Sequence, residues 1–127
     1  MTHTTNPLLS ENTIKSSIDE FIIKSKQGKN DSLFTVNTIQ TRFYSKKGKP
    51  INHNPNKLIP TQELDIVYEE NSNLYIFTKS SFFSTFSRIG KKPILFPTPN
   101  SESVDIDTKE DWKIAESIAL YKKNFES

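Results

Sequence analysis

Apolar residues recur with a helical period near the start of the chain. Between residues 10 and 28 they fall at i, i+4, i+7 and i+8: Ile14, Ile18, Phe21 and Ile22. That spacing places them on one face of a helix and predicts that this face is buried. Ser10 is a suitable N-cap, and Gly28 is suited to end the helix. We therefore predict a helix that packs against a core through this stripe.

Short segments of strand character follow the helix. They occupy residues 33–36, 66–70, 73–78 and 94–96, each bounded by polar, Gly or Pro residues. The run at 73–78 is a short apolar stretch, which predicts a strand buried on both faces. The Phe-rich residues 80–87 indicate a compact turn or a short helix.

A second long helix is predicted near the C-terminal end. Thr108 and Asp111 have the spacing of a capping box, in which each side chain bonds to the other residue's backbone. Four apolar residues behind it fall on one side: Trp112, Ala115, Ile118 and Ala119. Helices and short strands therefore interleave, which is typical of an α/β fold with roughly four or five strands and three helices. We predict a single domain over residues 1–127.

The stretch between residues 40 and 60 has a different character. Its cationic and histidine side chains alternate with Asn, Pro and a turn around Gly48: Arg42, Lys46, Lys47, Lys49, His53 and Lys57. This pattern predicts an exposed hairpin or arm that contributes little to the core. A solvated surface loop is favoured here over a dedicated anion site.

Composition and charge narrow the range of partners. The chain has 17 Lys+Arg against 15 Asp+Glu, a net charge of +2, which is too balanced to predict a nucleic-acid partner. It has no cysteine, which excludes disulfides and thiolate metal sites. Apolar runs are far shorter than a bilayer span, and the first residues lack signal-peptide character. We therefore predict a cytoplasmic protein with no membrane partner.

Two carboxylates before the last helix are candidates for metal binding. Asp105 and Asp107 alternate with Val104 and Ile106, so in an extended segment both carboxylates share one face. Paired hard oxygen donors suit Mg²⁺, particularly when a phosphate-bearing ligand completes the coordination. The alternative is that Asp107 caps the helix and Asp105 is a loop carboxylate. On these residues alone, this second interpretation is favoured.

Other chemistries find little support in the sequence. The chain has 3 Gly, at positions 28, 48 and 90, and none has the spacing of a phosphate-binding loop. His3 and His53 both lie in polar loops, where a lone histidine is usually solvated. Tyr75 lies inside an apolar run and is more often a core residue than one that faces a ligand.

Several short segments resemble those of one enzyme family, in the same order along the chain. The segments are Thr-Thr-Asn-Pro-Leu-Leu at 4–9, Glu-Leu at 63–64, Val-Tyr-Glu-Glu-Asn at 67–71, Asn-Leu-Tyr-Ile-Phe at 73–77, Arg-Ile-Gly-Lys-Lys-Pro at 88–93, Ser-Val-Asp-Ile-Asp-Thr at 103–108, Glu-Asp-Trp at 110–112 and Ala-Glu at 115–116. Together they are similar to the C-terminal half of the acylneuraminate cytidylyltransferases, which make CMP-sialic acid and related CMP-activated sugars.

The resemblance implies a fold and an activity. The fold would be part of a Rossmann-like α/β/α sandwich of the nucleotidyltransferase type, with residues 40–62 as an extended dimerisation arm. The complete enzyme would transfer CMP from CTP to a sialic-acid-like nonulosonic acid and release pyrophosphate. By the same resemblance, Asp105 and Asp107 would bind Mg²⁺, and His3, Asn6 and Tyr75 would border the sugar-acid pocket.

The chain also departs from the family pattern. The family begins with a glycine-and-basic segment that grips the CTP phosphates, followed by elements that hold cytosine, and this sequence contains neither. His3 stands where many members have Gln, and Leu9 where many have Arg. We therefore expect a half-enzyme that is inactive alone, whether truncated product, split enzyme or fragment.

Two roles remain open for such a half-enzyme. It would act as a homodimer or with a complementing N-terminal half. The alternative is a non-catalytic dimerisation or interaction module derived from the same fold. The residues do not distinguish among the possible nonulosonic acids.

Overall fold

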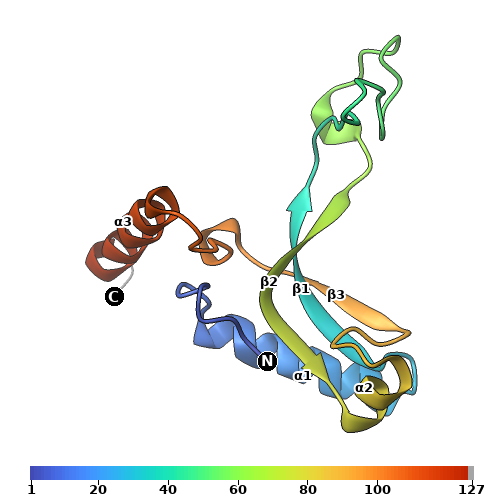
Figure 1. The fold of residues 1–127 in the computed structure, drawn as a ribbon, viewed down its shortest axis with the longest axis vertical. Coiled ribbons are helices and arrows are strands. Elements are labelled where there is room, and N and C mark those ends of the chain that lie inside the picture. Colours follow the sequence, from blue (N-terminus) through green and yellow to red (C-terminus); the bar gives the residue numbers. More distant parts are fainter. Residues whose placement is uncertain (126–127) are drawn as a thin grey trace. The chain divides into compact units, whose positions relative to one another are not determined.

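The computed structural model describes residues 1–125, and it is a mixed α/β structure (Figure 1). Its elements are α1 (Glu11–Lys26), β1 (Ser32–Ile39), β2 (Val67–Phe77), α2 (Lys79–Thr85), β3 (Pro93–Pro97) and α3 (Lys109–Phe125), with short 3-10 helices at Thr61–Glu63 and Asn100–Glu102. The α/β class predicted from the sequence is confirmed. None of the helices in residues 1–125 is both long enough and apolar enough to cross a bilayer.

Two compact units divide the chain. One combines Met1–Asn37 with the chain from Glu70 onward, and the other is Thr38–Glu69. The segment predicted to form an arm, residues 40–62, lies inside the second unit. The predicted helices, the predicted metal ligands and the sugar-acid residues all belong to the first.

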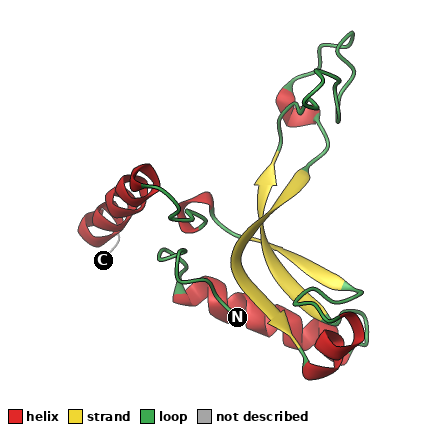
Figure 2. Cartoon of the chain, in the orientation of Figure 1, coloured by secondary structure: helices red, strands yellow, loops and turns green. Residues whose placement is uncertain are grey.

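The strands form one small mixed sheet with the order β2-β1-β3. β1 and β3 are parallel, with Leu33 opposite Ile94, and the strand arrows in Figure 2 show β2 running antiparallel to β1. The runs at 66–70 and 73–78 were predicted as two strands, and this is wrong, because both belong to β2. The Asn-Ser pair between them is an irregularity within the strand, where Ser72 adopts a left-handed conformation with φ 59°.

Helix α1 covers one face of the sheet, and its buried side chains differ from the predicted stripe. Phe21 packs with Leu33 and Ile94 in the core, as expected. Ile18 and Ile22, however, are 41% and 42% exposed, so the prediction that they are buried is wrong. Small polar residues face the sheet in their place, in particular Thr13 and Ser17.

The burial of Ser17 in place of Ile18 and Ile22 has a local cause. The Ser17 hydroxyl donates to the backbone oxygen of Ile14 at 2.7 Å, so the serine can be buried without an unsatisfied polar group. A short side chain at this position also allows close approach of helix and sheet. The helix predicted from the apolar period is confirmed, but the predicted buried face is wrong.

Two prolines remove hydrogen-bond donors from the outer edge of β3. The Thr98 amide donates to Val36 O at 3.0 Å, so the even-numbered residues of this segment direct their N–H groups toward β1. The N–H positions of residues 93, 95 and 97 then point away from β1. Pro93 and Pro97 have no N–H, which leaves little for another strand to pair with.

The start of β1 is tied to the turn that precedes β3 through Asp31. Its carboxylate accepts hydrogen bonds from the backbone amides of Lys91 and Lys92 at 2.9 and 3.0 Å. Burial raises the pKa of Asp31, but these two amides and the Ser32 hydroxyl outweigh it, so the pKa lies below its ordinary value. A Cβ on Gly90 would lie 2.3 Å from Asp31 Oδ1, so this turn requires glycine.

Gly90→Ala should therefore lower the free energy of unfolding by about 1–3 kcal/mol, because the new methyl group displaces a carboxylate that is held by several hydrogen bonds. Urea denaturation of a double-mutant cycle with Asp31→Ala measures this directly. In the Asp31→Ala background, most of the cost of Gly90→Ala should disappear. An equal cost in both backgrounds would show that the contact is not the cause.

Candidate functional site

The first residues of the chain pair with the outer edge of β2. The Met1 ammonium donates to Tyr75 O at 2.8 Å, and the Tyr75 amide donates to Met1 O at 2.8 Å. Thr2 forms an antiparallel bridge with Leu74. This pairing brings His3 beside Tyr75, with their ring centroids 6.0 Å apart.

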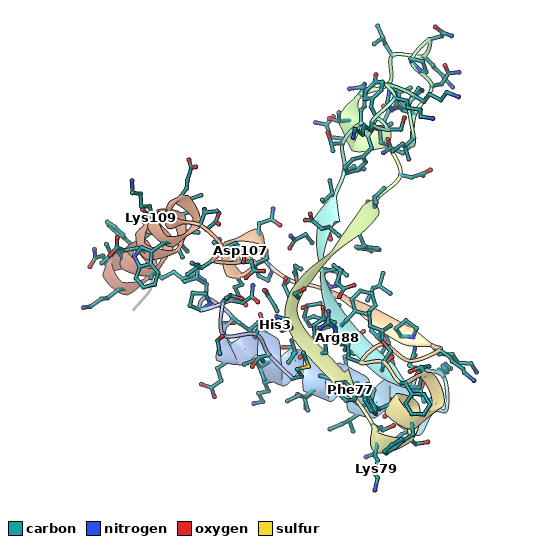
Figure 3. All side chains as sticks on the ribbon, viewed as in Figure 1. His3, Phe77, Lys79, Arg88, Asp107 and Lys109 are labelled. Atoms are coloured by element: carbon teal, nitrogen blue, oxygen red, sulfur yellow. The ribbon has the colours of Figure 1, made fainter. Side chains whose placement is uncertain are left out.

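The same segment also contacts the region of the predicted metal ligands. The Ile106 amide donates to Thr5 O at 2.9 Å. The Asn6 side chain is buried, and its Nδ2 donates to Val104 O at 3.5 Å. Figure 3 shows His3 beside β2 and Asp107 on the segment that leads into α3. Residues 1–6 therefore join two parts of the predicted site that lie about thirty residues apart in sequence.

Tyr75 is the best-defined polar group of the site. Its side chain is fully buried, and its hydroxyl donates to the Glu70 carboxylate, with Ser72 Oγ at 3.2 Å. The Arg88 guanidinium lies 4.1 Å from the centroid of the Tyr75 ring, and its Nη2 is 3.4 Å from Glu70 Oε1. The sequence predicted Tyr75 but missed Glu70 and Arg88, which only the fold brings to it.

This environment keeps the Tyr75 hydroxyl protonated. Burial raises the pKa of Tyr75, and the hydrogen bond to Glu70 raises it further. The Ser72 hydrogen bond and the charge of Arg88 act in the opposite direction without reversing the shift. The hydroxyl is thus a fixed hydrogen-bond donor, and no general base results from this arrangement.

Several buried polar atoms around the N-terminal segment have no hydrogen-bond partner among residues 1–125. They are His3 Nε2, Asn6 Oδ1, Asn73 Oδ1 and Asp105 Oδ1. The Asn73 side chain is held in place through its amide, which donates to Glu102 O at 2.9 Å. Buried polar groups are normally paired, so such a group of unpaired atoms indicates a place for solvent or a polar ligand.

The helix cap before α3 does not use the two aspartates. The Asp111 amide donates to Thr108 Oγ1 at 3.2 Å, and Asp111 Oδ2 accepts from the Thr108 amide at 2.8 Å. The predicted capping box is confirmed, and the alternative in which the Asp107 side chain caps the helix is wrong. The hydrogen bonds from Thr108 hold the pKa of Asp111 below its ordinary value.

Asp105 and Asp107 differ in their surroundings. Asp105 is half-buried, and its Oδ1 is one of the unpaired buried atoms, whereas Asp107 is exposed. Within residues 1–125, no group of three or more His, Cys, Asp or Glu side chains lies close enough to hold a metal ion. A cation at this pair would therefore need oxygen ligands from a bound molecule or from solvent, which is the usual arrangement for Mg²⁺.

An apolar pocket lies between the N-terminal loop and α3. It has a volume of about 400 Å³, and its lining includes Pro7, Leu8, Ile106, Trp112, Ala115 and Ala119. Of the predicted apolar side of this helix, Ala115 is buried, whereas Trp112 is exposed. Sequence reasoning missed the pocket, because the spacing of these residues also fits an ordinary core face.

No protein-family model matches the chain, and no curated protein matches it either. The likeness to the cytidylyltransferases therefore rests on the short sequence segments alone.

Tyr75 should ionise at a higher pH than an ordinary tyrosine, which can be followed by the ultraviolet absorbance of tyrosinate. The chain has 4 Tyr. In Tyr75→Phe, the part of the absorbance change that is due to Tyr75 should be lost, and the parts due to the other tyrosines should remain. Glu70→Gln should move the Tyr75 part to lower pH, because it removes a charge that raises the pKa of Tyr75. Tyr121→Phe, at an exposed site, should leave the pH at which Tyr75 ionises unchanged. The environment described here would be contradicted by a Tyr75 component with an ordinary pKa.

Proposed function

We propose that the chain is the sugar-acid- and metal-binding half of a CMP-sugar synthetase. The complete enzyme transfers CMP from CTP to a sialic-acid-like nonulosonic acid and releases pyrophosphate. In this proposal the three-stranded sheet is part of a Rossmann-like sandwich of the nucleotidyltransferase type. One observation supports it most: residues 1–6 make backbone contacts both with Tyr75 and with the segment before Asp107.

The residues near Tyr75 offer groups that fit a polyhydroxylated acid. His3 Nε2 and Asn6 Oδ1 are buried and have no hydrogen-bond partner in the part of the chain that the structure describes, and such atoms can bond to ligand hydroxyl groups. Arg88 makes a single long contact with Glu70, and both side chains are partly exposed, so this ion pair is weak. A ligand carboxylate could therefore take the place of Glu70 on the guanidinium. His3, Asn6 and Arg88 would bind the sugar acid, and Tyr75, whose side chain is fully buried, would border the pocket.

The predicted metal ligands fit a divalent cation in part. The unpaired buried Oδ1 of Asp105 is a hard oxygen donor, and the Asp107 carboxylate is exposed and takes no part in the helix cap. Asp105 and Asp107 would hold Mg²⁺ together with oxygen atoms of the substrates. When bound, the ion supplies positive charge that offsets the charge of a triphosphate.

The nucleotide part of the reaction needs another polypeptide segment. The sequence has no glycine-and-basic segment for the CTP phosphates, so the chain would be inactive alone. The outer face of α1 supports a partner, since Ile18, Ile22 and Ile23 are all exposed there. We propose that a complementing N-terminal half or a second copy covers this face.

A non-catalytic interaction module is the second candidate. The exposed apolar residues of α1 and of α3, including Trp112 and Phe125, favour it, because an interaction module needs such surfaces and no substrate. The two candidates differ in one measurable property, which is the binding of a sugar acid and Mg²⁺.

Titration of the chain with N-acetylneuraminic acid in the presence of Mg²⁺ tests the proposal. Binding is measured by calorimetry and by the change in the fluorescence of Trp112. Binding is expected, and Arg88→Ala should weaken it by roughly 10- to 100-fold, the value of a charge-assisted hydrogen bond. Lys91→Ala removes an exposed cation from the same turn and should leave affinity unchanged. N-acetylmannosamine lacks the carboxylate, so Arg88→Ala and the wild type should bind it with the same affinity.

The purified chain should form no CMP-sugar from CTP, with or without Mg²⁺. Absence of any response to sugar acid and Mg²⁺ would favour the interaction module. Formation of CMP-sugar by the isolated chain would show that it needs no second half, which would contradict the half-enzyme proposal.

A further inference from the structure

Glu70 supplies a negative charge to a stretch of the chain that has none of its own. Residues 71–101 contain no Asp or Glu, although they carry four cationic side chains: Lys79, Arg88, Lys91 and Lys92. Glu70 directly precedes this stretch and forms an ion pair with Arg88. Figure 3 shows Arg88 next to β2, the strand that carries both Glu70 and Tyr75. The anion that Arg88 contacts therefore belongs to the chain itself.

Two groups share one oxygen atom of the Glu70 carboxylate. Glu70 Oε1 accepts the hydrogen bond from the Tyr75 hydroxyl, and Arg88 Nη2 approaches the same atom at 3.4 Å. The Tyr75 contact is the shorter of the two, and 3.4 Å is long for a charge-assisted hydrogen bond, which usually spans about 2.7–2.9 Å. Ser72 Oγ, 3.2 Å from the Tyr75 hydroxyl oxygen, supports the same arrangement. Tyr75 therefore fixes the position of the carboxylate, and Arg88 adds little to it.

The Arg88 guanidinium has a second contact that does not depend on Glu70. Its central carbon lies 4.1 Å from the centroid of the Tyr75 ring, within the range of a cation–π interaction. The Arg88 side chain is 37% exposed and that of Glu70 39%, so water reaches both charges. Breaking the ion pair would leave Glu70 on the Tyr75 hydroxyl and Arg88 over the Tyr75 ring. Neither charge would then be buried without a partner, so the ion pair is easily exchanged.

We propose that Glu70 is an internal competitor for the carboxylate of the sugar acid. In the absence of ligand, Glu70 contacts Arg88. When the acid binds, its carboxylate replaces Glu70 on the guanidinium, and Glu70 keeps its hydrogen bond from the Tyr75 hydroxyl. The inference rests on the proposed function, because it requires that Arg88 binds the ligand carboxylate.

Internal competition has a consequence for the occupancy of the site. It lowers the affinity of Arg88 for every carboxylate by the same factor. A small anion that makes no other contact is then excluded at ordinary concentrations. A sugar acid also forms hydrogen bonds through its hydroxyl groups, so it still binds. Glu70 thus regulates access to Arg88 without touching the rest of the ligand.

Calorimetric titration of the wild type and of Glu70→Gln with N-acetylneuraminic acid, in the presence of Mg²⁺, tests this inference. The glutamine keeps an oxygen atom that accepts from the Tyr75 hydroxyl, but it lacks the charge that attracts Arg88. Glu70→Gln should bind the acid roughly two- to fivefold more tightly, the value of an exposed ion pair. Wild type and Glu70→Gln should bind N-acetylmannosamine, which has no carboxylate, with the same affinity.

Two further variants separate competition from a general effect of charge. Asp19→Asn removes an exposed carboxylate from α1 and should bind the acid as the wild type does. In the Arg88→Ala background, Glu70→Gln should bring no gain, because the group for which Glu70 competes is gone. An equal gain in both backgrounds would overturn the inference, since Glu70 would then act only by repelling the ligand carboxylate.

The same titrations distinguish failure of this inference from failure of the proposed function. Binding of the acid by the wild type, with equal or weaker binding by Glu70→Gln, would overturn the competition alone. Absence of binding by the wild type and by every variant would overturn the proposed sugar-acid site and the competition together.

Discussion

The arrangement of the candidate site depends on the backbone hydrogen bonds of the first five residues. Met1 exchanges hydrogen bonds with Tyr75 on the outer edge of β2, and Thr5 accepts one from Ile106. These bonds hold a short polar segment against both an edge strand and an otherwise irregular stretch before α3. These bonds bring His3 beside Tyr75, and the side chain of Asn6 adds a further contact with Val104 O. A few backbone contacts thus connect the proposed sugar-acid residues to the proposed metal ligands.

The sheet that carries this site has three strands. Its outer edges are partly protected from pairing, whereas the outer face of α1 is exposed. The outer edge of β3 lacks N–H groups at Pro93 and Pro97, and the outer edge of β2 is occupied in part by Met1 and Thr2. Edge-to-edge pairing is therefore a poor route to a partner. The apolar outer face of α1 is left uncovered within the described residues, as are Trp112, Tyr121 and Phe125 on α3.

Local patterns predicted local structure well, and contacts distant in sequence were the ones missed. The capping box of Thr108 and Asp111 was found because both residues lie within one turn. The period of α1 was correct, but the buried face was not, since a hydrogen-bonded Ser17 was not expected to face the sheet. The pairing of Arg88 and Glu70 around Tyr75 could not be foreseen, because ordinary spacing gives no sign of an interaction that the fold creates.

Amide hydrogen exchange, measured by NMR on the full chain, tests the central role of the N-terminal segment most directly. The amides of Tyr75 and Ile106 donate to Met1 O and Thr5 O, so both should exchange slowly. The account predicts that removing residues 1–5 makes both amides exchange rapidly while Leu33, in the core, stays protected. Rapid exchange of Tyr75 and Ile106 in the intact chain, or slow exchange after the deletion, would contradict it.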